Sequence, residues 1–409
     1  MGIRVSIGQR RARLVERHRL GVAAADNAGA VGGAVDALVA LHATDPVTVY
    51  LSAWARTGCS VAHVDEALYG DRNLVRMLGM RRTMFVVPAG LVEVVQAACS
   101  DEVARRLRRG LEKHLTDGGI GDGDAAGWLR SVEAGVLRAL AARGGGASGA
   151  QLSQDEPRLR AQLTYAPDKA YGGSANITSR VLGLLAADGH LVRGTRRGGW
   201  SSGQFEWFPA AAWLRSGGGA QSASESGGVL KADAARAELA RRWLLAFGPA
   251  LVSDLQWWAG WTAGQTKAAL AALPVAEVDL DGQPGVALAG DLEFPAGPPP
   301  ADGPGAAALL PGLDPTPMGW QARSWYLGPH APGLFDRTGN VGPTVWWQGR
   351  VVGGWAQRPS GEVVYRLLED VGSDGAAAVD AQAARLAAWL GQARVTPRFR
   401  TPLERELSA

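Results

Sequence analysis

Residues 176–208 read NITSRVLGLLAADGHLVRGTRRGGWSSGQFEWF, and this stretch decides the fold. Apolar residues recur at helical spacing over 176–188, and a glycine then ends the predicted helix. Two short strand-like runs, 190–194 and 204–208, flank a turn that is rich in Gly and Arg. A helix followed by a β-hairpin is the outline of a winged helix, whose helix enters a groove of DNA while its hairpin, the wing, lies beside the backbone.

The same order of elements returns on both sides of this stretch. The predicted elements of the first copy are helices at 34–41, 47–56 and 61–68 and strands at 74–77 and 84–87. Those of the third copy are helices at 233–247, 252–258 and 263–273 and a wing at 275–288 with Asp281-Gly282 as its turn. We therefore predict three successive winged-helix units.

Segments rich in Gly, Ser, Ala and Pro at 144–149, 216–228 and 295–305 are typical of flexible connections. Beyond about residue 306, short apolar runs bounded by Gly and Pro suit a small barrel or sandwich, followed by a final helix at 376–389. The predicted α+β chain thus has four domains, which are winged-helix unit 1 with N-terminal helices at 1–143, unit 2 at 144–228, unit 3 at 229–300, and a C-terminal β domain with a terminal helix at 301–409.

The composition favours a soluble, cytoplasmic protein without a metal or cofactor. No run approaches the roughly 18 to 20 uninterrupted apolar residues that cross a bilayer. Only Cys59 and Cys99 are present, too few for a disulfide framework, and neither has a partner at zinc-binding spacing. The six histidines are scattered, and no Gly-rich loop joins a strand to a helix, so we expect no cofactor.

The basic residues indicate DNA by their type rather than by their total. The net charge is only +3, but all except four of the 42 Lys and Arg residues are Arg, which contacts phosphates and bases in bidentate fashion. A GC-rich genome would produce the same bias. Arg81 and Arg82 fall on the first wing, and Arg193, Arg196 and Arg197 fall on the second. We expect these five side chains to bind double-stranded DNA.

The hexapeptide LHATDP, residues 41–46, concentrates polar groups between the first two helices of unit 1. Asp45 before Pro46 is typical of a helix N-cap, and His42 could cap the end of the preceding helix. In an extended turn, however, His42 and Thr44 would project to the same side and hold one water. A neutral imidazole can accept a proton from that water, the Thr hydroxyl can orient it, and Asp45 could stabilise a positive sugar. Hydrolysis of an N-glycosidic bond is therefore open to this group.

At these residues the chain resembles the tandem winged-helix superfamily of bacterial DNA glycosylases, the AlkZ/YcaQ-like enzymes. The segments that carry the resemblance lie at 41–56, 80–87, 247–249, 254–258, 310–315, 323–325, 349–353 and 397–403. The resemblance spans nearly all of the chain and implies three winged helices in a C shape with a C-terminal β-barrel. It also implies removal of bulky alkylated purines, usually N7-guanine adducts and cross-links formed by natural-product toxins, in repair or self-resistance.

In the characterised members of that superfamily the catalytic motif is Gln, an apolar residue, then Gln or Asp, where this chain has His42, Ala43 and Thr44. The resemblance thus makes His42 and Thr44 the candidate catalytic pair, with Asp45 following as in several relatives. N7 alkylation puts positive charge on the base, so the site mainly stabilises the sugar cation and positions water. None of the four lysines lies in or beside the hexapeptide, so we predict a monofunctional glycosylase that uses water rather than a Schiff-base lyase.

Two other functions stay open because neither glutamine of the motif is present. A non-catalytic winged-helix protein, such as a transcriptional regulator, would prefer an operator sequence and release no base. A protein that sequesters a toxin or toxin-damaged DNA would use Trp346, Trp347 and Trp355 to grip a flat ligand, unless these side chains fill the core. We expect a monomer, and the sequence leaves open which lesion, toxin or DNA sequence is recognised.

Overall fold

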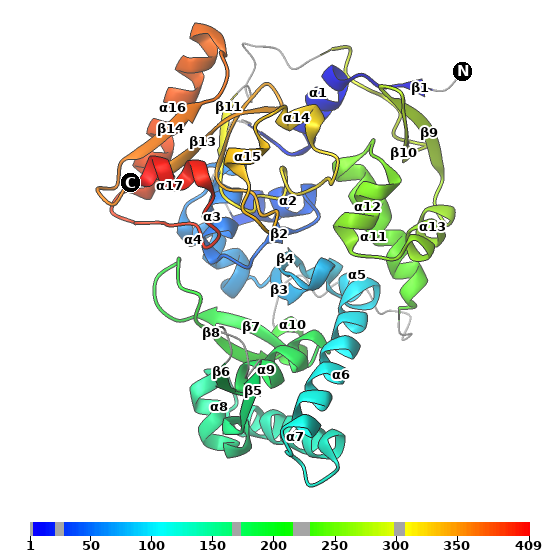
Figure 1. The fold of residues 1–409 in the computed structure, drawn as a ribbon, viewed down its shortest axis with the longest axis vertical. Coiled ribbons are helices and arrows are strands. Elements are labelled where there is room, and N and C mark those ends of the chain that lie inside the picture. Colours follow the sequence, from blue (N-terminus) through cyan, green and yellow to red (C-terminus); the bar gives the residue numbers. More distant parts are fainter. Residues whose placement is uncertain (1–2, 21–27, 166–172, 216–229, 298–306) are drawn as a thin grey trace.

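The computed structural model describes residues 3–20, 28–165, 173–215, 230–297 and 307–409 (Figure 1). The connection predicted at 216–228 lies outside these residues, as does most of the one predicted at 295–305. The described helices and strands form a mixed α+β fold. None of those helices is both long and apolar enough to cross a membrane.

The first helix–hairpin region contains the hexapeptide. Its elements are α1 (Ile7–Arg17), α2 (Ala28–Ala37), β2 (Leu41–His42), α3 (Pro46–Thr57), α4 (Val61–Asp65), β3 (Leu74–Leu78) and β4 (Met84–Pro88). Asp45 caps α3 by accepting a hydrogen bond from the Val47 N–H, and Pro46 fills the first helical position. The three strands form one antiparallel sheet in the order β2-β4-β3.

The helix predicted at 34–41 begins and ends earlier in the chain than expected. α2 ends at Ala37, and the left-handed backbone of Val39 (φ 65°) turns the chain before another helical turn can form. β2 then pairs with β4, so that its backbone groups are used by the sheet. His42 is therefore a strand residue, and the prediction that it could cap a helix is wrong.

The second helix–hairpin region follows the order predicted from 176–208. Its elements are α5 (Val92–Val95), α6 (Asp101–Asp117), α7 (Ala125–Arg143), α8 (Gly149–Asp155), β5 (Gln162–Tyr165), β6 (Gly173–Asn176), α9 (Thr178–Ala187), β7 (Leu191–Arg196), β8 (Phe205–Pro209) and α10 (Ala210–Arg215). Gly189 adopts a left-handed φ of 75° just after α9, which lets the chain turn into β7. The helix begins later than predicted because Asn176 pairs with Gln162 in the β5–β6 hairpin, which the sequence did not indicate.

The third helix–hairpin region has the predicted elements and one addition. It consists of α11 (Ala232–Phe247), α12 (Val252–Ala259), α13 (Ala263–Ala271), β9 (Val275–Leu280) and β10 (Gln283–Leu288). Asp281 and Gly282 form the predicted turn, both with positive φ. The addition is β1 (Ile3–Arg4), which pairs in parallel with β9 and attaches the start of the chain to this hairpin (Figure 1).

The C-terminal region is an open sheet covered by helices, which corrects the predicted β-barrel. Its elements are β11 (Ala307–Leu310), α14 (Ser324–Leu327), α15 (Ala331–Leu334), β12 (Thr344–Trp347), β13 (Arg350–Gln357), β14 (Val363–Leu367), α16 (Gly372–Leu390) and α17 (Pro402–Ser408). The antiparallel order is β11-β12-β13-β14, and within the described chain the two outer strands do not pair with each other. Helix α16 packs its apolar side chains on one face, so the sheet has no need to close on itself.

Two large apolar clusters hold these regions together. One joins side chains from α1, α11 and the C-terminal sheet, and the other is built from residues between Ala104 and Leu191. The second cluster crosses the predicted boundary at 143/144, and the division into four domains stays a prediction. Trp346, Trp347 and Trp355 are all buried, so they fill the core, which the sequence left open as the alternative to gripping a flat ligand.

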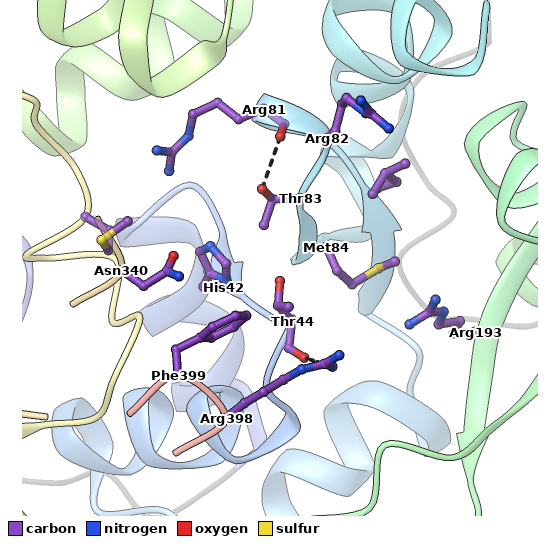
Figure 2. Close-up of a pocket in the computed structure, with 12 residues that line it drawn as sticks. His42, Thr44, Arg81, Arg82, Thr83, Met84, Arg193, Asn340, Arg398 and Phe399 are labelled. Atoms are coloured by element: carbon purple, nitrogen blue, oxygen red, sulfur yellow. Dashed lines mark hydrogen bonds between the residues drawn. The ribbon is translucent and has the colours of Figure 1, made fainter. Parts of the chain in front are cut away.

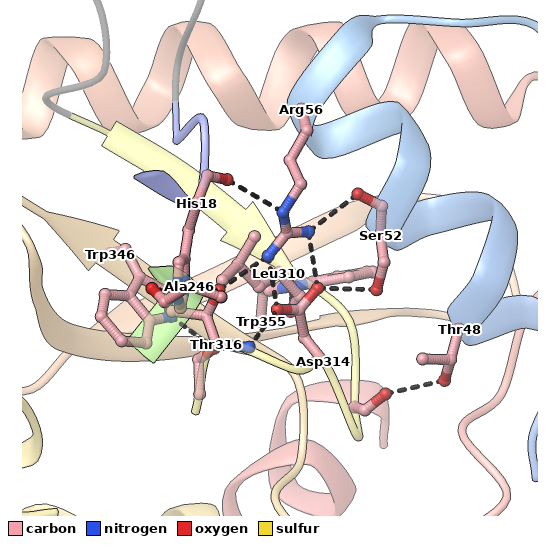
Figure 3. A network of polar contacts seen from close by, with 12 residues as sticks. His18, Thr48, Ser52, Arg56, Ala246, Leu310, Asp314, Thr316, Trp346 and Trp355 are labelled. Atoms are coloured by element: carbon pink, nitrogen blue, oxygen red, sulfur yellow. Dashed lines mark hydrogen bonds and ion pairs between the residues drawn. The ribbon is translucent and has the colours of Figure 1, made fainter. Parts of the chain in front are cut away.

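A buried polar network links these regions around the guanidinium of Arg56 (Figure 3). Arg56 on α3 forms a bidentate ion pair with Asp314, at 2.7 and 2.8 Å, and both side chains are fully buried. The Ser52 hydroxyl donates to the same carboxylate at 2.6 Å. Arg56 also donates to the Thr316 hydroxyl and the His18 carbonyl. The segment 310–315, one of those that carry the family resemblance, thus connects the C-terminal region to α1 and α3.

Replacing Asp314 with alanine should lower the free energy of unfolding by about 3 to 5 kcal/mol, because Arg56 would stay buried without a counter-charge. Chemical denaturation followed by circular dichroism measures the change. The control is Glu362→Ala, which removes a surface ion pair with Arg358 and should change stability by less than about 1 kcal/mol. Equal effects of the two substitutions would contradict a dominant role for the buried pair.

Candidate functional site

A cavity of about 540 Å³ opens where three regions of the chain meet (Figure 2). Its walls come from the hexapeptide, the turn between β3 and β4, strand β7 and the loops of the C-terminal region. The lining residues are His42, Thr44, Leu78, Arg81, Arg82, Thr83, Met84, Arg193, Met318, Asn340, Arg398 and Phe399. Four are arginines and none is acidic, so the cavity attracts anions. Among the described residues, no three His, Cys, Asp or Glu side chains gather as a metal site requires.

The hexapeptide places His42 and Thr44 on the same side of the chain. Strand β2 lies against β4, and the Ala43 N–H donates to the Met84 carbonyl at 2.8 Å. Side chains alternate along an extended backbone, so His42 and Thr44 line the cavity while Ala43 packs into the apolar core. This is the arrangement that the sequence predicted for the two polar side chains.

Burial keeps the imidazole of His42 neutral. Burial first, and the positive charge of Arg81 second, lower the pKa of His42 to about 3. The ring packs against Phe85 with centres 5.1 Å apart, and its Nδ1 is buried without a hydrogen-bond partner in the described chain. A neutral imidazole has one ring nitrogen that accepts a hydrogen bond. His42 thus has the protonation state needed to accept a hydrogen bond from water.

Asp45 does not line the cavity. One oxygen of its carboxylate accepts the Val47 N–H at 3.1 Å, and the other accepts the backbone N–H of Arg398 at 2.9 Å. The Arg398 guanidinium in turn donates to the Thr44 carbonyl at 3.2 Å. These bonds hold the C-terminal segment that contains Phe399 against the hexapeptide, although the two lie about 350 residues apart in sequence.

Arg81 and Arg82 lie at the tip of the first hairpin, as predicted, and both line the cavity, although Arg81 is partly buried and only Arg82 is exposed. They belong to a helical turn, Met80–Arg82, in which both have a positive φ. The Arg81 guanidinium stacks on the ring of Trp257 in α12 at 3.9 Å, and burial lowers the pKa of Arg81 to about 10. Contact with the third region therefore turns this side chain inward.

The second hairpin divides its three arginines between two places. Arg193 lines the cavity, whereas Arg196 forms an ion pair with Asp65 and donates to the Tyr50 hydroxyl. Arg197 lies beyond β7, where its N–H donates to the Gln204 carbonyl, and it is not among the lining residues. The structure thus brings Arg81, Arg82 and Arg193 to the cavity and leaves the other two outside.

The tip of this hairpin is docked on the protein. Trp200 packs against Tyr50 of α3 and Trp389 of α16, with ring centres 5.3 and 5.5 Å apart, and the Trp389 Nε1–H donates to the Cys59 carbonyl. We call Trp200, Tyr50 and Trp389 the aromatic clasp. The clasp joins the second region to the first and to the C-terminal helix.

Sequence reasoning missed Asn340 and Phe399. The Asn340 Nδ2 donates to Asp336 at 2.9 Å and to Thr338 at 2.8 Å. Its amide donors are thus used within the turn, and its oxygen can accept a hydrogen bond from a ligand in the cavity. Figure 2 shows the Asn340 amide and the Phe399 ring beside His42. The segment 397–403 carries part of the resemblance to the glycosylase superfamily, and this was a signal that could have pointed to Phe399. The turn at Asp336 gave no local sign that it faces a residue about 300 positions earlier.

Replacing His42 with glutamine should make the protein less sensitive to acid. The unfolded chain binds the His42 proton near pH 6.5 and the folded protein near pH 3, so the associated stability is present above about pH 6.5 and lost as the pH falls towards 3. Between pH 7 and pH 5, His42→Gln should lose about 2 kcal/mol less unfolding free energy than the wild type.

Urea denaturation at the two pH values measures this difference. His18, whose pKa burial also lowers to about 3, is present in both proteins and cancels in the comparison. Equal losses in the two proteins would show that His42 titrates like an exposed histidine.

The chain matches the model of a family described as DNA glycosylase AlkZ-like over residues 35–389. Among solved structures, it is similar to the Streptomyces sahachiroi DNA glycosylase AlkZ, with 18% sequence identity and a TM-score of 0.68. The similarity covers 94% of this chain and 98% of the other, and at this level of identity it indicates a shared fold. A comparison with curated proteins found no match.

Proposed function

The chain belongs to the AlkZ-like DNA glycosylase family, and from that premise we propose that it is a monofunctional glycosylase for alkylated purines of the N7-guanine type or cross-links in double-stranded DNA. The observation that carries the proposal is the meeting of neutral His42 and Thr44 in one arginine-lined cavity. The cellular role would be repair or self-resistance against toxins that alkylate DNA.

The reaction breaks the C1′–N9 bond, whose electron pair neutralises the positively charged base as it leaves. Water then forms a bond to C1′ of the sugar cation, and its proton passes to His42 or to solvent. A base with a pKa near 3 is weak, but a sugar cation is so electrophilic that attack needs little proton removal. Thr44 would orient this water through its hydroxyl. No lysine lines the cavity in the described chain, so water is the nucleophile.

The opposite wall offers groups that fit a purine. Phe399 and Met318 supply apolar surface for stacking, and the free oxygen of Asn340 accepts hydrogen bonds from N–H groups such as those on the Watson–Crick edge of guanine. Asp45 acts as a positioning residue because its carboxylate holds the segment with Phe399 beside His42. It would not touch the sugar.

We infer that the three helix–hairpin regions are winged helices that hold the duplex in a concave surface, with the protein acting as a monomer. The hairpins concerned are β3–β4, β7–β8 and β9–β10. Arg82 and Arg193, which also line a second cavity beside α6 and α9, would bind the DNA backbone. The domain boundaries proposed for this arrangement stay at 143/144, 228/229 and 300/301.

Incubation of the protein with duplex DNA containing 7-methylguanine should release the free base. His42→Ala should slow release by about 10²-fold, because the attacking water loses the hydrogen bond that positions it. The matched control is His190→Ala, because His190 is exposed and does not line the cavity; its rate should equal that of the wild type. Tight DNA binding without base release from any N7 adduct would instead favour a non-catalytic DNA-binding protein.

Borohydride treatment during the reaction should trap no covalent complex between protein and DNA, because no lysine among the described residues lines the cavity to form a Schiff base. Gel electrophoresis under denaturing conditions detects such a complex. A lyase that is known to form one serves as the positive control. A trapped adduct would contradict the use of water as nucleophile.

A further inference from the structure

Arg76 on β3 is buried without a hydrogen-bond partner. It is 4% exposed, and none of its three guanidinium nitrogens has a partner in the described chain. Its cross-strand neighbour is Val86, and Leu78, two residues further along, faces Met84. Residues two apart on a strand share a face, so Arg76 lies on the face of the sheet that carries the cavity-lining Leu78 and Met84. Burial of an unpaired charge is unfavourable and calls for an explanation.

Strand β7 contacts β3, so Arg193 lies near Arg76, and Arg193 in turn lies near Arg398. Burial, and then the charges of Arg76 and Arg398, lower the pKa of Arg193. Arg193 and Arg398 both line the cavity, and Figure 2 shows them on the side where Thr44 and Met84 lie. Within the described residues, no carboxylate forms an ion pair with any of the three. By contrast Arg196, three residues beyond Arg193, has Asp65 as its partner.

The aromatic neighbours leave the polar edges of this cluster for a ligand. Arg76 lies over the ring of Phe205 at 4.8 Å, and Arg193 over that of Trp207 at 5.2 Å. A cation–π contact uses no N–H donor, so the N–H groups of Arg193 remain for hydrogen bonds with a ligand. Arg193 also lines the neighbouring cavity beside α6 and α9, so it stands between the two hollows.

We propose that Arg76, Arg193 and Arg398 form a phosphate site that holds the backbone phosphate next to the excised nucleotide. Arg193 and the exposed Arg398 contact the phosphate, because guanidinium groups bind its oxygens in bidentate fashion. Arg76 lies behind them as a positioning residue whose charge adds to the attraction. A bound phosphate supplies the negative charge that this cluster lacks. The site rests on the proposed function in that its ligand is DNA.

The test uses a duplex with a central tetrahydrofuran in place of the damaged nucleotide and one neutral methylphosphonate at a single backbone position. Wild-type affinity should fall about tenfold when the neutral group replaces the bound phosphate. Arg193→Gln and Arg76→Met should bind the unmodified duplex about tenfold more weakly than the wild type does. The methylphosphonate at the bound position should cause no further loss of their affinity. For both variants, the slope of log affinity against log salt concentration should decrease in magnitude by about one.

Controls separate this role from a structural one. Arg76→Met removes a buried unpaired charge, so its melting temperature should equal or exceed that of the wild type while its affinity falls. Arg76→Lys should restore part of the affinity. Arg358→Gln, at an exposed ion pair with Glu362, should keep the full methylphosphonate effect.

Persistence of the methylphosphonate effect in Arg193→Gln or in Arg76→Met would overturn the site. If Arg76→Met does not fold, Arg193→Gln alone decides, because Arg193 lines the cavity and carries no ion pair in the described chain. The probe has no base, so failure to excise a base would not alter this result. Conversely, evidence against the phosphate site would not alter the measurement of base release by the wild type.

Discussion

The ion pair between Arg56 and Asp314 is the contact on which the rest of the structure depends. Arg56 lies near the end of α3, and the same helix begins at Asp45, the cap that holds the segment with Phe399. Fixing the end of α3 to the C-terminal region therefore also fixes its beginning. Burial alone would raise the pKa of Asp314, but the charge of Arg56 and its hydrogen bonds bring it below the ordinary value. The pair stays charged and directional.

The buried polar groups around Asp314 and those around the cavity differ in how fully they are paired. Around Asp314, each polar atom is matched by a donor or acceptor, which is the condition for a buried charge to be tolerated. Around the cavity, the Nδ1 of His42 and the guanidinium of Arg76 have no partner in the described residues. Unpaired buried polar atoms also occur elsewhere in the described chain, as at Arg10 and Trp243, so it is their position beside an arginine-lined cavity that favours a site for a polar, anionic ligand.

The sequence predicted those features that have a local cause. Helical spacing located α9 and α11, the Asp281-Gly282 turn located the third hairpin, and alternation placed His42 and Thr44 together. What it missed depends on contacts between distant segments. The pairing of β1 with β9 leaves no local pattern, and the open C-terminal sheet is explained by α16 covering its face. Asn340 and Phe399 reach the cavity by the same kind of long-range contact, which periodicity does not encode.

The aromatic clasp has a consequence for the mechanics of recognition. With Trp200 held by Tyr50 and Trp389, and Arg196 held by Asp65, the second region is fastened at its tip as well as at its root. Contacts at both ends restrict movement of the second region relative to the rest of the protein. In the proposed function, the duplex therefore has to deform to fit it, and the elastic energy of DNA becomes part of the selection. Sites where an adduct has already weakened stacking bend at lower energy, so stiffness itself favours damaged over intact DNA.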